Sequence, residues 1–278
     1  MTATLPAPTV LRLHRTALTG WLVAFTAVAA LLLWAYGPGA DAAVAEWNRL
    51  CARQRPCTWG GGSIMNYYRA FTLAEFLILW IPGLVAAWAG AALIGRELEN
   101  GTARLAWTQG VTPTRWLAAK LTVPAVLLTA GTTVLVLLHR LAYDTNTLPM
   151  GWTWDRDNTF GTNGTTAIAW PLLALAVGAF AGLLLRRALP ALAVGFLVAG
   201  TVRILVHETT PHLWPHETAA GDAKNGYRTP VNVMNLGEGT YHPASHFWPL
   251  QLVETGFALT ITAAAVTTAF WLLRRRTA

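Results

Sequence analysis

The segment Gly95–Lys120, with the sequence GRELENGTARLAWTQGVTPTRWLAAK, separates two apolar stretches at residues 73–94 and 121–138. Each stretch is close to the roughly 20 residues that a helix needs to cross a membrane. The segment between them carries charges of both signs, on Arg96, Glu97, Glu99, Arg104, Arg115 and Lys120. Because charged groups are costly inside a bilayer, these side chains must lie in water at a membrane face.

The charged segment contains signals for a short helix of its own. Gly101 interrupts the helix-forming residues before it, an amphipathic piece follows over residues 102–109, and Thr112 and Pro113 predict a turn. We therefore predict a short helix outside the bilayer, between two spanning helices.

The composition of the whole chain sets its class. Of 278 residues, 54% are hydrophobic and only 12% are charged, about half the charged fraction of a soluble domain. This excludes a soluble protein and predicts an all-α integral membrane protein. The formal net charge of +7 comes from Lys and Arg at the ends of apolar runs. Such charges indicate orientation in the bilayer, and nucleic acid is not an expected partner.

Six apolar stretches are predicted to span the membrane, each as a helix of about 30 Å. They cover residues 17–36, 73–94, 121–142, 167–185, 188–206 and 251–273 of one transmembrane domain. For the first stretch a cleaved secretory signal is the competing interpretation, because Arg12 and Arg15 precede it. Its apolar run is longer than a signal core, which favours a retained helix.

Small residues indicate where some of these helices come close to a neighbour. The inner half of the second span contains Ala86, Ala87, Gly90, Ala91 and Ala92. The fourth span has Gly178 and Gly182 at the GxxxG spacing, which lets two helix backbones approach each other in a membrane. Both spans are predicted to pack closely against another helix.

The distribution of Lys and Arg predicts the orientation. These residues are concentrated near the two ends of the chain, in Gly95–Lys120 and at Arg186-Arg187. Because cytoplasmic loops carry the excess of basic residues, both termini are expected to be cytoplasmic. Residues 37–72, 143–166 and the long segment 207–250 then lie outside.

The two cysteines of the chain fall in the first outer segment. Cys51 and Cys57 lie away from the reducing cytosol in the predicted orientation, so a disulfide that closes a small loop is plausible. Two free thiols are the alternative that the spacing leaves open. A zinc site would need more ligands than this segment offers.

Four charged residues are expected near the outer ends of the spans: Glu75, Arg140, Arg203 and Glu254. Opposite charges at similar depth suggest salt bridges that hold an outer gate shut. Contact with a substrate in the pathway is one alternative. Arginine side chains that merely extend to the interface are another.

The outer segment 207–250 contains most of the histidines: His207, His212, His216, His242 and His246. The pairs 212/216 and 242/246 have the spacing with which helical histidines share a metal. Pro211, Pro215 and Pro243 interrupt the helix that this geometry needs. We therefore expect no metal site and interpret the segment as an outer lid.

The charged segment also carries short motifs: Glu97 and Glu99, Gly101-Thr102, Leu105 and Thr108, then Thr114-Arg115-Trp116 and Lys120. Together they resemble the first cytoplasmic loop of type-2 ABC exporter permeases, in which a coupling helix docks on a separate ATP-binding subunit. The resemblance implies contacts with that subunit for Glu97, Glu99, Gly101, Thr102, Arg104 and Arg115. The two glutamates are expected to pair with basic residues of the ATPase or to fix Arg104 and Arg115 within the loop.

The same resemblance implies further features of the chain. It suggests an amphipathic helix before the first span, at residues 5–16, and a non-spanning outer region between the fifth and sixth spans. Two permease copies, identical or related, would meet around a central pathway and bind two ATPase subunits, which hold the ATP and Mg²⁺. This chain has no GxxxxGK[ST] phosphate loop and no cofactor of its own is expected.

Two classes of function follow. The leading one is the permease subunit of an ATP-driven exporter in a bacterial plasma membrane, moving an amphiphilic drug, lipid or peptide through a pathway lined by apolar side chains. The Ala, Arg and Trp content resembles that of GC-rich bacteria. The alternative is a membrane-bound, metal-dependent enzyme that uses the outer histidines.

Overall fold

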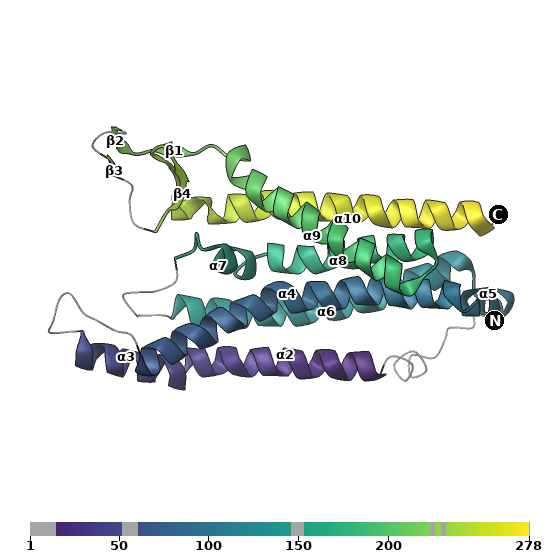
Figure 1. Ribbon diagram of the computed structural model, residues 1–278, viewed down its shortest axis with the longest axis horizontal. Helices are drawn as coiled ribbons and strands as arrows, with labels where there is room; N and C mark the ends of the chain where they lie inside the picture. Colours follow the sequence, from purple (N-terminus) through teal and green to yellow (C-terminus); the bar gives the residue numbers. More distant parts are fainter. Residues whose placement is uncertain (1–14, 52–60, 146–152, 223–225, 229–231, 278) are drawn as a thin grey trace.

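Long helices that run along one axis form most of the molecule (Figure 1). The computed structural model describes residues 15–51, 61–145, 153–222, 226–228 and 232–277. Its helices are α2 (Arg15–Tyr36), α3 (Pro38–Leu50), α4 (Gly62–Glu99), α5 (Thr102–Thr108), α6 (Pro113–Asp144), α7 (Asp157–Thr162), α8 (Thr166–Leu185), α9 (Ala188–Leu213), η1 (Ala244–His246) and α10 (Phe247–Thr277). In the described part, 6 helices are long and apolar enough to cross a membrane. The predicted all-α membrane fold is confirmed.

The two ends of the bundle differ. At one end α5 lies near the C-terminal end of α10, and at the other end lie the strands (Figure 1). We call these the α5 end and the sheet end. The predicted amphipathic helix at residues 5–16 falls almost entirely outside the described residues.

Short antiparallel strands form the sheet end, inside the predicted outer segment 207–250. Strands β1 (Glu217–Thr218), β5 (Thr240–His242) and β4 (Met234–Gly237) pair in this order, and β2 (Ala220–Asp222) pairs with β3 (Gly226–Arg228). These strands were not predicted from the sequence. None is longer than 4 residues, which is too short for an alternating pattern to be recognised.

Helix α4 begins well before the predicted second span. Its first turns carry Tyr67 and Phe71, which are buried in one cluster with Ala35 of α2 and Ala43 of α3. This packing extends the helix beyond the apolar stretch that starts at residue 73. Helix α3 was also not predicted, although Pro38 at its first position is a helix-start signal.

Cys51 follows α3 directly and is buried. Its amide donates a hydrogen bond to the carbonyl of Trp47 at 2.8 Å, which completes the last turn of the helix. Cys57 lies outside the described residues. The bond between Cys51 and Cys57 therefore stays a prediction.

Of the described elements, α4 and α8 share the most extensive interface. A Cβ atom added at Gly90 would collide with the carbonyl oxygen of Leu175, and one at Gly178 would lie 2.8 Å from that of Ala87. The two helices are thus in backbone contact, which only small residues permit. The predicted close packing of the second and fourth spans is confirmed.

A single methyl group at this contact should destabilise the bundle. Gly90→Ala is expected to lower the free energy of unfolding by about 1–3 kcal/mol, because the backbones must separate. Gly83→Ala is a matched control, since a Cβ at Gly83 in the same helix would have no neighbour within 4 Å. Unfolding of both variants in detergent micelles measures the difference. Equal losses at the two positions would contradict the expectation.

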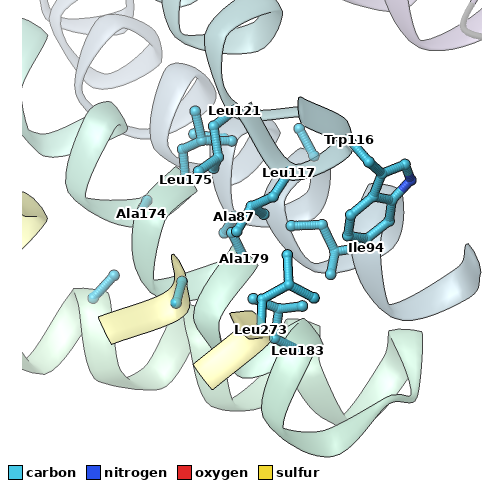
Figure 2. Close-up of a cluster of buried hydrophobic side chains, with 14 of the residues drawn as sticks. Ala87, Ile94, Trp116, Leu117, Leu121, Ala174, Leu175, Ala179, Leu183 and Leu273 are labelled. Atoms are coloured by element: carbon cyan, nitrogen blue, oxygen red, sulfur yellow. The ribbon is translucent and has the colours of Figure 1, made fainter. Parts of the chain in front are cut away.

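At the α5 end the helices enclose a cluster of buried apolar side chains, shown in Figure 2. Trp116 and Leu117 bring the start of α6 into this cluster, Ile94 the end of α4, Leu183 the end of α8 and Leu273 the end of α10. The helix ends that flank α5 are therefore anchored in one core.

Candidate functional site

The chain turns sharply on both sides of α5. After α4 ends, Gly101 has a φ of 72°, a left-handed conformation that glycine adopts without strain. After α5, the Thr112 hydroxyl accepts a hydrogen bond from the amide of Arg115 at 3.3 Å, and Pro113 takes the first position of α6. These are the expected features of a helix start. The predicted short helix between two long ones is present.

Glu97, in the last turn of α4, binds two side chains of α6. Its Oε2 accepts a hydrogen bond from the indole Nε1 of Trp116 at 2.8 Å, and its Oε1 lies 2.5 Å from the Nζ of Lys120. The carboxylate and the ammonium group are largely shielded from water, with side-chain exposures of 22% and 16%. Charge-assisted hydrogen bonds in this setting hold α4 and α6 in one orientation.

Glu99 contacts a different part of the chain. Its Oε2 accepts a hydrogen bond at 3.1 Å from the amide of Ala188, the first residue of α9. A carboxylate at this position satisfies a free amide and faces the positive end of the helix. Glu99 therefore ties the end of α4 to the turn between α8 and α9.

The suggested pairing of these glutamates with loop arginines is wrong. The ion pairs of the described residues include none between Glu97 or Glu99 and Arg104 or Arg115. Both arginine side chains are exposed. Their positive charges thus face outward, while the negative charges serve contacts within the chain.

Helix α5 has a packed face and a free face. Ala103 is fully buried, and the ring of Trp107 meets that of Trp116 edge to face, with 5.7 Å between centroids. On the other side Leu105 is 58% exposed, and Arg104 and Thr108 are exposed beside it. Arg104, Leu105 and Thr108 define what we call the α5 face. It presents an apolar side chain next to a positive charge.

Glu75, at the sheet end, lies in a buried polar cluster. Its Oε1 accepts a hydrogen bond from the Thr159 hydroxyl at 2.6 Å and lies 3.3 Å from the Nε2 of His139. The other ring nitrogen, Nδ1, lies 3.2 Å from the Oδ1 of Asn163. Glu75 is 1% exposed and His139 0%. Both contacts of the carboxylate use Oε1, whereas Oε2 of Glu75 is buried without a hydrogen-bond partner among the described residues, so the carboxylate is only partly satisfied and depends on the Thr159 and His139 contacts.

Glu254 also pairs with a histidine. Its Oε1 accepts a hydrogen bond from the Nε1 of Trp170 at 2.8 Å, and its Oε2 lies 3.4 Å from the Nδ1 of His207. Glu254 is on α10, while Trp170 and His207 are on α8 and α9. One buried carboxylate therefore links three helices.

The two arginines of the predicted gate bind carbonyl groups and aromatic rings. Arg203 donates to the carbonyl of Leu79 at 3.0 Å and lies over the rings of Trp80 and Trp170. Arg140 lies over the ring of Trp248, with 4.8 Å to its centroid.

The predicted pairing within this charged set is therefore wrong. In the part of the chain that the structure describes, no ion pair joins Glu75 or Glu254 to Arg140 or Arg203. The partners of the four residues are instead His139, His207, the backbone, and Asp144, whose Oδ2 lies 3.9 Å from the Nε of Arg140. His139 was not among the site residues predicted from the sequence, although an ionisable residue within a span is itself a signal of function.

A cavity of about 400 Å³ opens at the sheet end. It lies between α7, α9, β4 and α10, and Asp155, His207, Glu208, His212 and Glu254 contribute its titratable groups. Phe160, Met234 and Leu250 contribute apolar surface. The cavity thus combines acidic and apolar lining, and Glu254 connects it to the polar contacts between the helices.

The histidines of the sheet end do not gather as metal ligands. Within the described ranges, no three His, Cys, Asp or Glu side chains come together as an ion would require. His242 and His246 contact each other instead, with 3.0 Å between their Nδ1 atoms. His212 and His216 are exposed.

His242 should make the sheet end sensitive to acid. Its Nε2 donates to the carbonyl of Pro211 at 2.8 Å, so its Nδ1 must accept the hydrogen bond from His246. Burial, and then the neighbouring histidines, lower the pKa of His242 below its ordinary value. The unfolded chain therefore binds a proton at His242 more readily than the folded chain does. The contribution of neutral His242 to the stability of the fold is complete above about pH 6.5 and is lost as the pH falls below that value.

We expect the apparent Tm to fall by a few degrees between pH 7.5 and 5.5, as thermal unfolding in detergent would show. His242→Gln should reduce this dependence, because the buried titrating group is removed. The exposed His212→Gln is the control and should retain most of it, because His212 makes the smallest of the contributions that lower the pKa of His242. An identical pH profile for His242→Gln and the unchanged protein would refute the assignment.

Comparison with known proteins gives one result. A family model described as ABC-2 membrane transporter related matches residues 22–210, which run from within α2 to near the end of α9. No curated protein and no solved structure matches the chain. The matched range includes α5 and all its contacts with α4 and α6. The chain belongs to the ABC-2 membrane transporter related family.

Proposed function

We propose that this chain is the membrane subunit of an ATP-driven exporter in a bacterial plasma membrane. In this proposal two copies enclose a pathway for an amphiphilic drug, lipid or peptide, with both termini in the cytoplasm. Family membership supports a permease that associates with an ABC ATP-binding subunit. ATP and Mg²⁺ are held by that subunit, and this chain responds to its movement.

The observation that carries the proposal is the rigid attachment of α5 to the ends of the spanning helices. Trp107 of α5 contacts Trp116, and Trp116 donates to Glu97 of α4. A force on α5 is therefore transmitted to α4 and α6 as a rigid-body movement rather than absorbed by a flexible loop. The α5 face, with Leu105 exposed, is the surface on which we place the ATPase.

The far side of the pathway is assigned to the sheet end. The polar contacts of Glu75 and Glu254 join helices that must separate if the bundle opens there. We therefore retain Glu75, Arg140, Arg203 and Glu254 as gate or pathway residues, with histidine and backbone partners in place of direct ion pairs. The exposed apolar side chains of α9, such as Leu189 and Leu197, suit lipid or the second copy.

A pull-down tests the docking surface. The tagged chain and its Leu105→Glu variant are purified in mild detergent and assayed for a stoichiometric ATPase subunit. Leu105 is exposed, so the change should leave the fold intact and reduce ATPase recovery at least about tenfold, because a charge would be buried without a partner. Gln109→Glu adds the same charge to the same loop and is the control.

Each outcome decides a part of the proposal. Docking on α5 is supported if the unchanged chain and Gln109→Glu both recover the ATPase and Leu105→Glu does not. Equal recovery with all three proteins would move the docking surface elsewhere. If no ATPase is recovered under conditions that preserve the fold, the exporter proposal fails.

A further inference from the structure

A second feature of the α5 end is a pocket of about 90 Å³ between α5, the turn after α8 and the end of α10. Three arginines from these separate elements line it: Arg104, Arg186 and Arg276. Of the described residues that line it, none is acidic. The positive charge of the pocket is therefore not balanced from its own walls.

The backbone positions two of these arginines. Arg276 donates from its guanidinium group to the carbonyl of Leu183 at 2.6 Å, which fixes the end of α10 against the end of α8. Arg186 caps α8 with a φ of 53°, a left-handed conformation that disfavours a residue with a Cβ atom.

One residue that lines the pocket carries a buried hydrogen-bond donor without an acceptor. Trp107 lines it, and the indole Nε1 of Trp107 is buried with no partner among the described residues. An indole nitrogen can only donate, and buried donors are almost always satisfied. An anion bound here would balance the guanidinium charges, and a small rotation of the Trp107 ring toward it would give the indole N–H its acceptor.

We infer that this pocket binds the phosphate group of an anionic phospholipid from the adjacent leaflet. Guanidinium groups suit the geometry and charge of phosphate. Leu98, Leu183 and Leu272 add apolar surface, which a lipid can cover and a free phosphate ion cannot. The nearby Trp271 is half exposed, with the guanidinium group of Arg275 4.2 Å from its ring centroid, as is typical of side chains at headgroup level.

The bound phosphate would join α5 to α10. Arg104 is on α5 and Arg276 is on α10, so one anion between them would add a polar link to the apolar cluster that already joins Ala103 of α5 and Leu273 of α10. A phosphate group bound in the pocket would hold α5 more firmly against α10, the last spanning helix. Anionic lipid is thereby expected to raise the stability of the α5 end, in addition to the role of α5 in docking.

The test measures lipid binding to the full chain in detergent micelles. Dioctanoyl phosphatidylglycerol is titrated, with bound lipid counted by native mass spectrometry and stabilisation followed as the shift in Tm. Dioctanoyl phosphatidylcholine carries the same phosphate with a compensating cation, and inorganic phosphate is the free anion. We expect saturable binding of phosphatidylglycerol, at least about tenfold weaker binding of phosphatidylcholine, and weak binding of inorganic phosphate.

Variants locate the bound lipid. Arg104→Gln changes an exposed side chain and should weaken phosphatidylglycerol binding about tenfold, with the lipid-free Tm unchanged. Arg274→Gln removes the same charge from the end of α10 outside the pocket and is the control. Trp107→Phe, which removes the unpaired donor, should weaken binding as well.

Three results would overturn the inference. One is equal phosphatidylglycerol binding by Arg104→Gln and Arg274→Gln. Another is binding of inorganic phosphate as tight as that of the lipid, which would make the pocket a site for free anions. The third is loss of ATPase recovery in Arg104→Gln with lipid binding unchanged, which would assign the pocket to an acidic side chain of the partner protein.

Discussion

Glu97→Ala is expected to lower the free energy of unfolding by about 2–4 kcal/mol and to uncouple ATP hydrolysis from transport. The substitution removes the hydrogen bond from Trp116 and the ion pair with Lys120 together. It leaves a mostly buried ammonium group and an indole N–H without acceptors. Because Trp116 also supports Trp107, the packed face of α5 loses its support as well.

The uncoupling has a distinct signature in the complex with its ATPase. Where α5 is loosely held, movement of the ATPase should shift α5 without shifting α4 and α6. ATP hydrolysis should then continue while transport into inverted vesicles falls at least about tenfold, which corresponds to a rise of about 1.4 kcal/mol in the activation free energy of transport. Stability is measured separately by unfolding in detergent.

Two controls separate the ion pair from general damage. Glu99→Ala removes one exposed hydrogen bond to Ala188 and should cost less than Glu97→Ala. Glu97→Ala combined with Lys120→Met forms a double-mutant cycle, in which the second change should restore part of the lost stability because the unpaired charge is gone. A fully additive cycle would show that the pair contributes nothing.

The sequence predicts the depth of the charged residues better than their partners. The apolar stretches place Glu75, Arg140, Arg203 and Glu254 near one membrane face, while Gly101 predicts the start of α5 and Pro113 the start of α6. The partners depend on how each helix is rotated about its own axis, which packing contacts such as that between Gly90 and Gly178 decide. One residue of rotation turns a side chain by about 100°, enough to exchange an arginine for a histidine as neighbour.

Other features depend on contacts that no local pattern contains. Strand β5 pairs with β1, which lies more than 20 residues earlier in the chain. The polar link made by Gln251 was missed for the same reason: its side chain bridges the carbonyl of Phe160 and the amide of Thr166, both remote in sequence. The small residues of the second and fourth spans predicted close packing but not which helices would meet.

Glu75→Ala is expected to produce the largest loss of stability, about 3–5 kcal/mol, because it breaks a fully buried polar cluster. The change leaves His139 and Thr159 without their shared acceptor in a region that water does not reach. Glu75→Gln keeps a carbonyl oxygen for the Thr159 hydroxyl, so it should lose less. Unfolding in detergent micelles orders the two variants against the unchanged protein.

The position of Glu75 suggests a test of whether the buried cluster also holds the gate closed. Glu75 is on α4, His139 on α6 and Thr159 on α7, so the cluster joins three elements at the sheet end. If these elements separate when the pathway opens, Glu75→Gln should weaken the closed state and raise substrate leak without ATP while the fold persists. His139→Ala should raise it to a similar extent, because it removes the other half of the same link. A leak unchanged in both variants, with reduced stability, would make the cluster a structural support that stays intact during transport.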